Sequence, residues 1–156
     1  MIGNRNEIIS WLLDQEEKLF EIKEYKEKRG LRANAYCWTL LGKIARVLNT
    51  TKEEVYRDYI RNYGVYRVVT LNNSAVKTFQ TLWNGKGLGY ISEIVSSNEE
   101  YTEIIAYYGT SSYNTKQMSQ FIDYVVQEAK QLGIETLPPE EIEKLKRTWE
   151  NEKNGN

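Results

Sequence analysis

One basic segment carries residue types that could bind an anionic polymer. The stretch KEYKEKRGLR at positions 23–32 contains five basic side chains, Lys23, Lys26, Lys28, Arg29 and Arg32. Tyr25 lies among them, and Tyr36 follows shortly afterwards. Because lysine and arginine contact phosphates and aromatic rings stack on unpaired bases, this combination is typical of single-stranded nucleic-acid binding. An ordinary charged helix end, with its lysines neutralised by neighbouring glutamates, explains the same residues equally well.

Two further groups of residues could extend this surface. Arg57 and Arg61 lie four positions apart on a predicted helix, so they share one face. The loop GTSSYNTKQ at 109–117 places Ser111 and Ser112 just before another predicted helix start, where free N–H groups favour anions. The same pattern is more commonly an ordinary N-cap loop, and both interpretations stay open.

Two absences exclude whole classes of catalytic site. The chain contains no histidine, which excludes HNH-type nucleases, Ser-His-Asp and Cys-His nucleophile systems, and most zinc sites. Its single cysteine, Cys37, cannot form an intramolecular disulfide, and we expect it to be a small buried hydrophobic residue. We therefore expect neither a metal nor a cofactor.

The remaining catalytic candidates are weak. Asp14, Asp58 and Asp123 fall in three different predicted elements, whereas a metal-dependent nuclease needs carboxylates that converge on one point. The glycine-rich stretch GKGLG at 85–89 lacks the spacing of a phosphate-binding loop and is expected to be a flexible connection. We predict that the protein is not an enzyme, and a metal-dependent nuclease remains an alternative.

These residues must be positioned by helices and strands, and the order of the expected elements predicts an α+β protein. It has a small, mostly antiparallel sheet packed with several helices. The expected helices cover about 4–15, 31–48, 51–64, 74–84, 115–134 and 138–150, and the expected strands cover 18–26, 65–71, 88–97 and 100–109. Thr51 and Glu54 form a capping-box pattern, and Gly64 ends that helix. We expect one domain over 1–150 and a frayed tail over 151–156.

Charge and hydropathy set the cellular context. The net charge is −1, yet residues 18–67 contain twelve Lys and Arg against six Asp and Glu. This local excess of positive charge favours an anionic partner. No apolar stretch reaches the roughly 20 residues that a membrane span needs, and the N-terminus lacks a signal-peptide pattern. We expect a cytoplasmic protein that has no membrane contact.

Asn34 is anomalous within the predicted 31–48 helix. Its spacing places it on one face with the apolar residues Leu31, Ala35, Trp38 and Leu41. A buried amide is costly unless it is hydrogen-bonded, so we expect Asn34 to bond a neighbouring backbone or loop, such as 109–113. Trp38 is expected to belong mainly to the core.

Two separated segments jointly resemble the phage NinB (Orf) family of recombination proteins. KRGLRANAYCWTLLGKIARVL at 28–48 is similar to that family's R-S-L-x-x-N-x-x-x-W segment, and YYGTSSYNTKQMSQFIDYVVQEAKQLGIETLPPEE at 107–141 is similar to its second segment. The matching positions are Arg29, Leu31, Asn34, Trp38, Gly109, Ser111, Ser112, Met118 and Gly133. Gly30, Arg32 and Ala33 depart from the family pattern, and residues 65–105 match none of it.

The resemblance implies a non-enzymatic recombination mediator. Such a protein is a homodimer, binds single-stranded DNA with little sequence preference, contacts the host single-strand-binding protein and assists recombinase loading, in the host cytoplasm if it is phage-encoded. With the basic residues, it points to a nucleic-acid site of Lys26, Lys28, Arg29, Arg32, Asn34, Arg57, Arg61, Ser111 and Ser112. An interaction module that binds the single-strand-binding protein without touching DNA remains an alternative.

Overall fold

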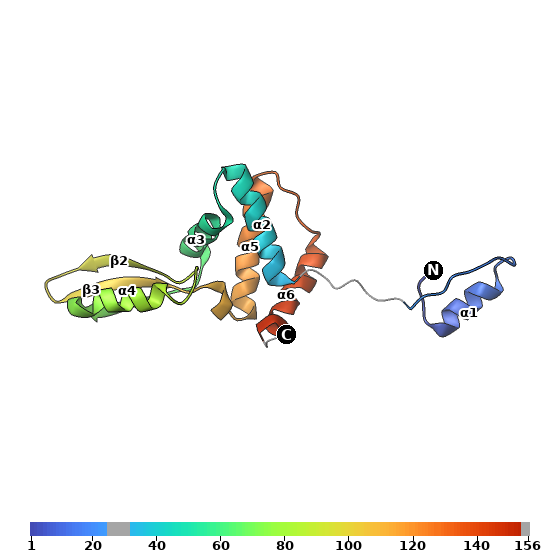
Figure 1. Cartoon of the computed structure of the whole chain (residues 1–156), viewed down its shortest axis with the longest axis horizontal. Coiled ribbons are helices and arrows are strands. Elements are labelled where there is room, and N and C mark those ends of the chain that lie inside the picture. Colours follow the sequence, from blue (N-terminus) through green and yellow to red (C-terminus); the bar gives the residue numbers. More distant parts are fainter. Residues whose placement is uncertain (25–31, 154–156) are drawn as a thin grey trace. The chain divides into compact units, whose positions relative to one another are not determined.

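The computed structural model describes residues 1–24 and 32–153, and its contacts divide the chain into two units, Met1–Gly30 and Leu31–Asn156 (Figure 1). The first unit contains helix α1 (Arg5–Leu13). Asn4 is its N-cap and forms a capping box with Glu7, because each side chain accepts a hydrogen bond from the other residue's backbone N–H.

The strand expected over 18–26 is wrong for its described part. Residues 18–24 form no strand, and residues 25 and 26 lie outside the described residues. Side chains in this segment alternate between two faces as in a strand, but charged side chains occupy both faces. A strand is stable only when a neighbouring strand accepts its backbone hydrogen bonds. The ion pair of Lys23 with Glu21 (3.1 Å) is exposed and does not substitute for such a neighbour.

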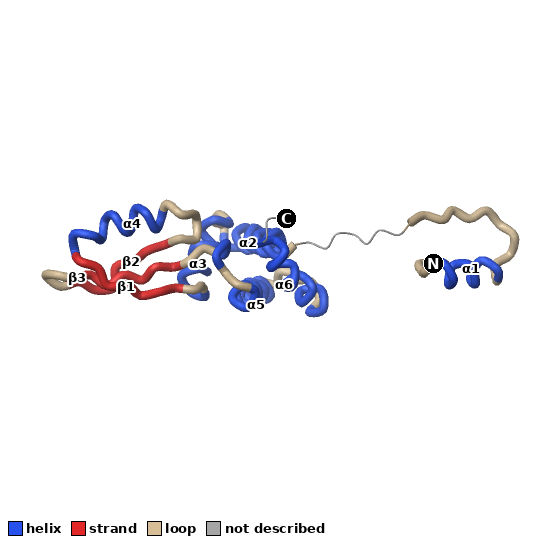
Figure 2. The backbone as a smooth tube through the Cα atoms, turned by 90° about the horizontal axis from the view of Figure 1, so that it is seen from below, coloured by secondary structure: helices blue, strands red, loops and turns tan. Residues whose placement is uncertain are grey.

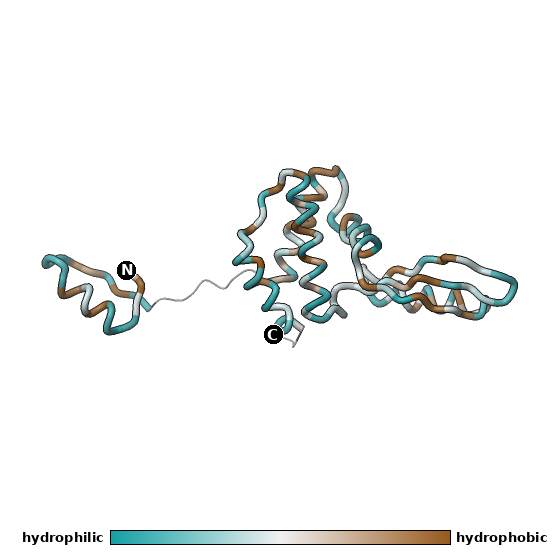
Figure 3. The backbone as a smooth tube through the Cα atoms, turned by 180° about the vertical axis from the view of Figure 1, so that it is seen from behind, coloured by the Kyte–Doolittle hydropathy of each residue, from teal (hydrophilic) through white to brown (hydrophobic). Residues whose placement is uncertain are grey.

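The second unit is built on four helices that enclose the main core. They are α2 (Ala33–Leu48), α3 (Lys52–Tyr63), α5 (Thr115–Gln131) and α6 (Pro139–Lys153). Their fully buried side chains include Leu40, Leu41, Ile44, Ile60, Phe121, Ile122 and Val125, and Figure 3 shows hydrophobic residues recurring along these helices. The predicted helix ends at Thr51 and Gly64 are confirmed, and the side chain of Thr51 accepts from the backbone N–H of Glu54. Asn114 is the N-cap of α5. Amphipathic spacing therefore predicted these helices correctly.

A small sheet with one covering helix extends from this bundle (Figures 1 and 2). Within the described residues the antiparallel sheet contains β1 (Tyr66–Asn72), β2 (Ile91–Ser97) and β3 (Tyr101–Tyr107) in the order β1-β3-β2. Helix α4 (Val76–Asn84) covers one face of it and follows a 3₁₀ turn at Asn73–Ala75. Ile104, on the central strand, is completely buried. The strands predicted at 88–97 and 100–109 are confirmed as β2 and β3, which pair as an antiparallel hairpin.

The opposite face of the sheet is partly open, because Ile91 and Tyr107 are buried on it whereas Tyr66 and Val68 are exposed. The β1–β3 register pairs Val68 with Ile105, which places both on the face away from Ile104. Val68 is 51 % exposed and Tyr66, on the same face, is 60 % exposed. The sheet therefore presents apolar side chains that nothing in the described part of the chain covers.

The predicted α+β class with a mostly antiparallel sheet is confirmed. The second unit forms a single α+β domain. The expected boundaries differ in two respects. Residues 1–30 form a unit of their own instead of joining a domain over 1–150. Helix α6 continues to Lys153, so residues 151–153 of the expected frayed tail are helical. In the described ranges no helix is long and apolar enough to cross a membrane.

Candidate nucleic-acid interface

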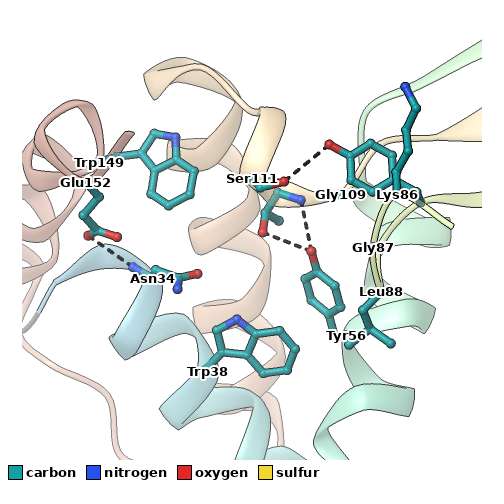
Figure 4. Close-up of a pocket in the computed structure, with 13 residues that line it drawn as sticks. Asn34, Trp38, Tyr56, Lys86, Gly87, Leu88, Gly109, Ser111, Trp149 and Glu152 are labelled. Carbon is teal, nitrogen blue, oxygen red and sulfur yellow. Dashed lines mark hydrogen bonds between the residues drawn. The ribbon is translucent and has the colours of Figure 1, made fainter. Parts of the chain in front are cut away.

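A cavity of about 400 Å³ lies where the helices meet the loops that lead to and from the sheet (Figure 4). Its walls come from α2, α3 and α6, from the α4–β2 loop and from the loop after β3. The lining residues are Asn34, Trp38, Tyr56, Lys86, Gly87, Leu88, Gly89, Tyr90, Gly109, Thr110, Ser111, Trp149 and Glu152. Such a volume lies within the range of small-ligand sites.

Aromatic side chains form much of this wall. The ring of Trp38 is half-buried and lies 4.6 Å from the ring of Tyr56, centroid to centroid. Trp149 is 4 % exposed, and its indole Nε1 donates to the carbonyl oxygen of Tyr113 at 2.8 Å. Tyr90 is half-buried on the side of the α4–β2 loop. The rings thus come from four different segments of the chain.

The hydroxyl of Tyr56 anchors the loop after β3. The backbone N–H of Thr110 donates to Tyr56 Oη at 3.0 Å, and Tyr56 Oη also lies 3.0 Å from Thr110 Oγ1. Burial raises the pKa of Tyr56 above its ordinary value of 10, so the phenol keeps its proton at neutral pH. Its oxygen accepts from the backbone N–H of Thr110, and in the bond between the two hydroxyls either oxygen can be the donor. Beside it, Ser111 Oγ lies 3.3 Å from Tyr90 Oη.

Two glycines let the loops approach each other closely. A Cβ atom on Gly89 would lie 2.7 Å from the Cα atom of Gly109 and 2.7 Å from Tyr56 Oη. A Cβ atom on Gly109 would lie 2.8 Å from the ring of Tyr90. Gly89, the last residue of the glycine-rich stretch at 85–89, therefore lies where the two loops approach closely and a side chain would collide.

Asn34 and Glu152 face the cavity from α2 and α6. The backbone N–H of Asn34 donates weakly to Glu152 Oε1 at 3.4 Å. The hydroxyl of Thr148 has two acceptors for its one proton, the carbonyl oxygen of Leu145 at 2.7 Å and the same Glu152 oxygen at 3.1 Å. The backbone N–H of Ala33 donates to Thr148 Oγ1 at 3.0 Å. Helix α6 thus satisfies the first N–H groups of α2, which has no side-chain cap of its own.

The expectation that Asn34 is a buried amide is wrong, because Asn34 is exposed. The buried face of α2 contains Ala33, Tyr36, Cys37, Leu40 and Leu41, so the true core face is rotated from the one that Asn34 and Ala35 suggested. Trp38 is half-buried: it packs against the core and also lines the cavity.

Cys37 is 2 % exposed, which confirms it as a buried hydrophobic residue. Its burial raises the pKa of the thiol to about 12. The thiol is therefore uncharged and packed inside the bundle at neutral pH, and it is not a nucleophile candidate.

Basic side chains lie at the rim. Lys86 Nζ is 4.8 Å from the ring centroid of Trp83, which favours a cation–π contact. Arg57 and Arg61 line a neighbouring depression of about 550 Å³ that shares Tyr90 with the cavity. Arg61 is bound to Glu93 at 2.8 Å and to Asp58 at 3.2 Å. Arg57 makes no ion pair with any residue that the structure describes.

The structure brings some of the predicted site residues together and leaves others apart. Asn34 and Ser111 line one cavity, and Arg57 and Arg61 lie next to it. Arg32 is the N-cap residue of α2 and is half-buried. Lys26, Lys28 and Arg29 lie outside the described residues. Ser112 lines a different depression, beside Tyr66 and Gln117, and its Oγ donates to the carbonyl oxygen of Gly109 at 2.8 Å.

Sequence reasoning missed Lys86, Tyr90, Trp149 and Glu152 as lining residues. The sequence held a signal for Lys86 and Tyr90, because both flank glycines that allow two backbone segments to approach each other closely. None existed for Trp149 and Glu152, which lie in an amphipathic helix whose position against α2 the sequence does not give.

Within residues 1–24 and 32–153, no three His, Cys, Asp or Glu side chains form a group that could hold a metal ion. Comparison of the chain with protein-family models, with curated proteins and with solved structures yields no match.

Proposed function

We propose that this protein is a non-enzymatic, NinB-like recombination mediator that binds single-stranded DNA through the cavity and its rim. The observation that carries the proposal is the convergence of the two segments that resemble the family. Asn34 and Trp38 from the first segment line the same cavity as Gly109 and Ser111 from the second, although more than 70 positions separate them in the sequence.

The chemistry of the cavity supports a single strand as ligand. Trp38 and Tyr90 are half-buried rings that an unpaired base can contact, and such contacts contribute about 1–3 kcal/mol per base. Lys86 and Arg57 supply positive charge at adjacent rims, where the phosphates that flank an inserted base would pass. A double helix keeps its bases stacked and cannot insert one without unpairing it.

The first test removes the two rim charges. The double variant Lys86→Gln/Arg57→Gln should bind a fluorescently labelled oligonucleotide more weakly in an anisotropy titration. Each lost phosphate contact lowers the slope of log K against log salt by about 0.7, so two should lower it by about 1.4.

Lys130→Gln/Lys144→Gln is the matched control, because both lysines are exposed and neither lines the cavity. It changes the net charge equally and should keep the slope of the unmodified protein. Equal binding by all three proteins would contradict the proposal.

A second test addresses the basic segment before α2. Neutralising Lys28, Arg29 and Arg32 together to glutamine should lower the salt slope by about 2 if all three contact phosphates. A folded variant with unchanged affinity and slope would remove this segment from the binding surface.

The resemblance extends the proposal to a homodimer that contacts the host single-strand-binding protein. The open sheet face with Tyr66 and Val68 supports a second copy as its cover, because apolar patches of this kind mark interaction sites. A titration with a labelled acidic peptide tests the protein contact. Competition by an oligonucleotide then decides whether both ligands use the same surface.

A further inference from the structure

A second depression, of about 550 Å³, lies along the exposed side of α2, and we call it the α2 groove. Small residues of the helix, Ala35, Thr39 and Gly42, line it, and Trp38 lines it as well. A Cβ atom added to Gly42 would meet nothing within 4 Å. The groove is therefore open to a ligand along the helix.

The charge of the α2 groove is entirely positive within the described part of the chain. Lys43, Arg46 and Lys52 line it, all three are exposed, and no acidic residue lies beside them in the lining. None of the three forms an ion pair with a carboxylate that the structure describes. The cavity, in contrast, combines Lys86 with Glu152 (Figure 4). The α2 groove therefore offers the stronger attraction to an anion.

The α2 groove adjoins the cavity at Trp38, which lines both. Tyr90 has the same role on the other side, because it lines both the cavity and the depression that contains Arg57. The three depressions thus follow one another with a half-buried ring at each junction. Trp38 and Arg46 are eight residues apart, about 12 Å along the helix axis, so only an extended ligand can contact both.

We propose that the α2 groove holds the sugar-phosphate backbone of the bound strand where it leaves the cavity past Trp38, and that Lys43, Arg46 and Lys52 bind its phosphates. This inference rests on the proposed binding of single-stranded DNA and deepens it, because it states where the strand continues. Trp38 is the single aromatic residue in the described lining of the groove. Binding along the groove is therefore electrostatic and independent of base sequence.

The first test removes the charge of the groove. The triple variant Lys43→Gln/Arg46→Gln/Lys52→Gln, the groove variant, is titrated with a labelled oligodeoxythymidine of about 12 nucleotides, within the usual site size. Each phosphate contact contributes about 0.7 to the slope of log K against log salt, so losing three should reduce its magnitude by about 2.

The matched control is Lys77→Gln/Lys130→Gln/Arg147→Gln. It removes two lysines and one arginine, as the groove variant does, so the net charge changes equally. The three residues are exposed and line neither the cavity nor the groove. This control should keep the slope of the unmodified protein. An unchanged slope in the groove variant, or an equal reduction in both variants, overturns the inference.

The second test blocks the groove without changing its charge. Gly42→Leu places a branched side chain in the groove, and the open space around the Cβ position lets the helix accept it. We expect this variant to bind the oligonucleotide several-fold more weakly, whereas Gly42→Ala should bind it as the unmodified protein does. Equal affinity of the two variants would place the strand elsewhere.

A labelled peptide of about 12 glutamates tests the other ligand that three cations could attract, because acidic motifs are recognised by clusters of basic residues. If the groove variant loses affinity for this peptide but binds the oligonucleotide as the unmodified protein does, the groove is a protein-docking surface. The inference is then overturned, and single-strand binding stands. If the unmodified protein binds no oligonucleotide, the proposed function itself fails. Circular dichroism establishes that each variant is folded.

Discussion

The hydroxyl of Tyr56 is the smallest feature on which the shape of the cavity depends. Replacing Tyr56 by Phe leaves the backbone N–H and the hydroxyl of Thr110 without their partner, and Thr110 is only 5 % exposed. Unsatisfied buried polar groups cost about 1–3 kcal/mol, so we expect Tyr56→Phe to lower the free energy of unfolding by about that amount in urea titrations.

Tyr101→Phe is the control for this experiment, because Tyr101 is 45 % exposed and its hydroxyl makes no hydrogen bond within the described part of the chain. It should change stability by less than about 0.5 kcal/mol. Equal stability of the two variants would mean that the Tyr56–Thr110 contact does not hold the loop.

Gly89 offers a second test at the scale of one residue. The added methyl group of Gly89→Ala would overlap the backbone at Gly109 and the hydroxyl of Tyr56, both at 2.7 Å. Overpacking of this kind typically costs about 1–3 kcal/mol, and we expect oligonucleotide binding to weaken because both loops line the cavity. Gly42→Ala provides the contrast, since its Cβ meets nothing within 4 Å in the middle of α2. It should stabilise the protein by about 0.5–1 kcal/mol.

At the scale of elements, the start of α2 depends on α6. The helix lacks a side-chain N-cap, and Thr148 accepts the N–H of Ala33 in its place. Thr148→Val keeps the shape but removes the acceptor, so we expect a loss of about 1 kcal/mol in thermal or urea unfolding.

Thr39→Val is the matched substitution within α2, because Thr39 is exposed and bonds only the carbonyl oxygen of Ala35 one turn earlier. It should change stability by less than about 0.5 kcal/mol. If both variants lose the same stability, the cap from α6 contributes nothing specific.

At the scale of the whole molecule, the buried core makes stability depend on alkaline pH. Burial raises the pKa of Cys37 from 9.0 to about 12 and that of Tyr113 from 10.0 to about 12. The folded state therefore holds both protons more tightly than the unfolded chain does. This contribution is complete below pH 9 and is lost as the pH rises from about 9 to 12.

Thermal midpoints measured by circular dichroism should accordingly fall over that interval. In a Cys37→Ala variant the decline should begin nearer pH 10, where unfolded tyrosine starts to ionise. A midpoint that stays constant up to pH 12 would contradict the burial of these two groups.

The open sheet face gives a prediction about assembly. We expect light scattering after size exclusion to report a dimer, and Val68→Glu to shift it towards monomer by placing a charge on the apolar face. Val47→Glu is the control, because Val47 is similarly exposed at 53 % but lies on α2. A dimer that persists in Val68→Glu would exclude this face as its interface.

The sequence alone determined the helices and strands of the second unit, because their hydrophobic spacing and caps are local properties of the chain. Thr51, Gly64 and Asn114 mark helix ends through bonds that span only a few residues. The same local logic failed at residues 18–24, where strand formation would need a partner elsewhere.

Only the tertiary structure decided which residues form the cavity. Trp149 and Glu152 line the same cavity as Asn34 because α6 packs against the start of α2, and Gly89 lies close to Gly109 because their two loops approach each other. These contacts join positions that are 20 to 118 residues apart. Local patterns carry no information about such long-range packing, which depends on how whole elements fit together. The residues of the two family-like segments were visible in the sequence, but their meeting around one cavity was not.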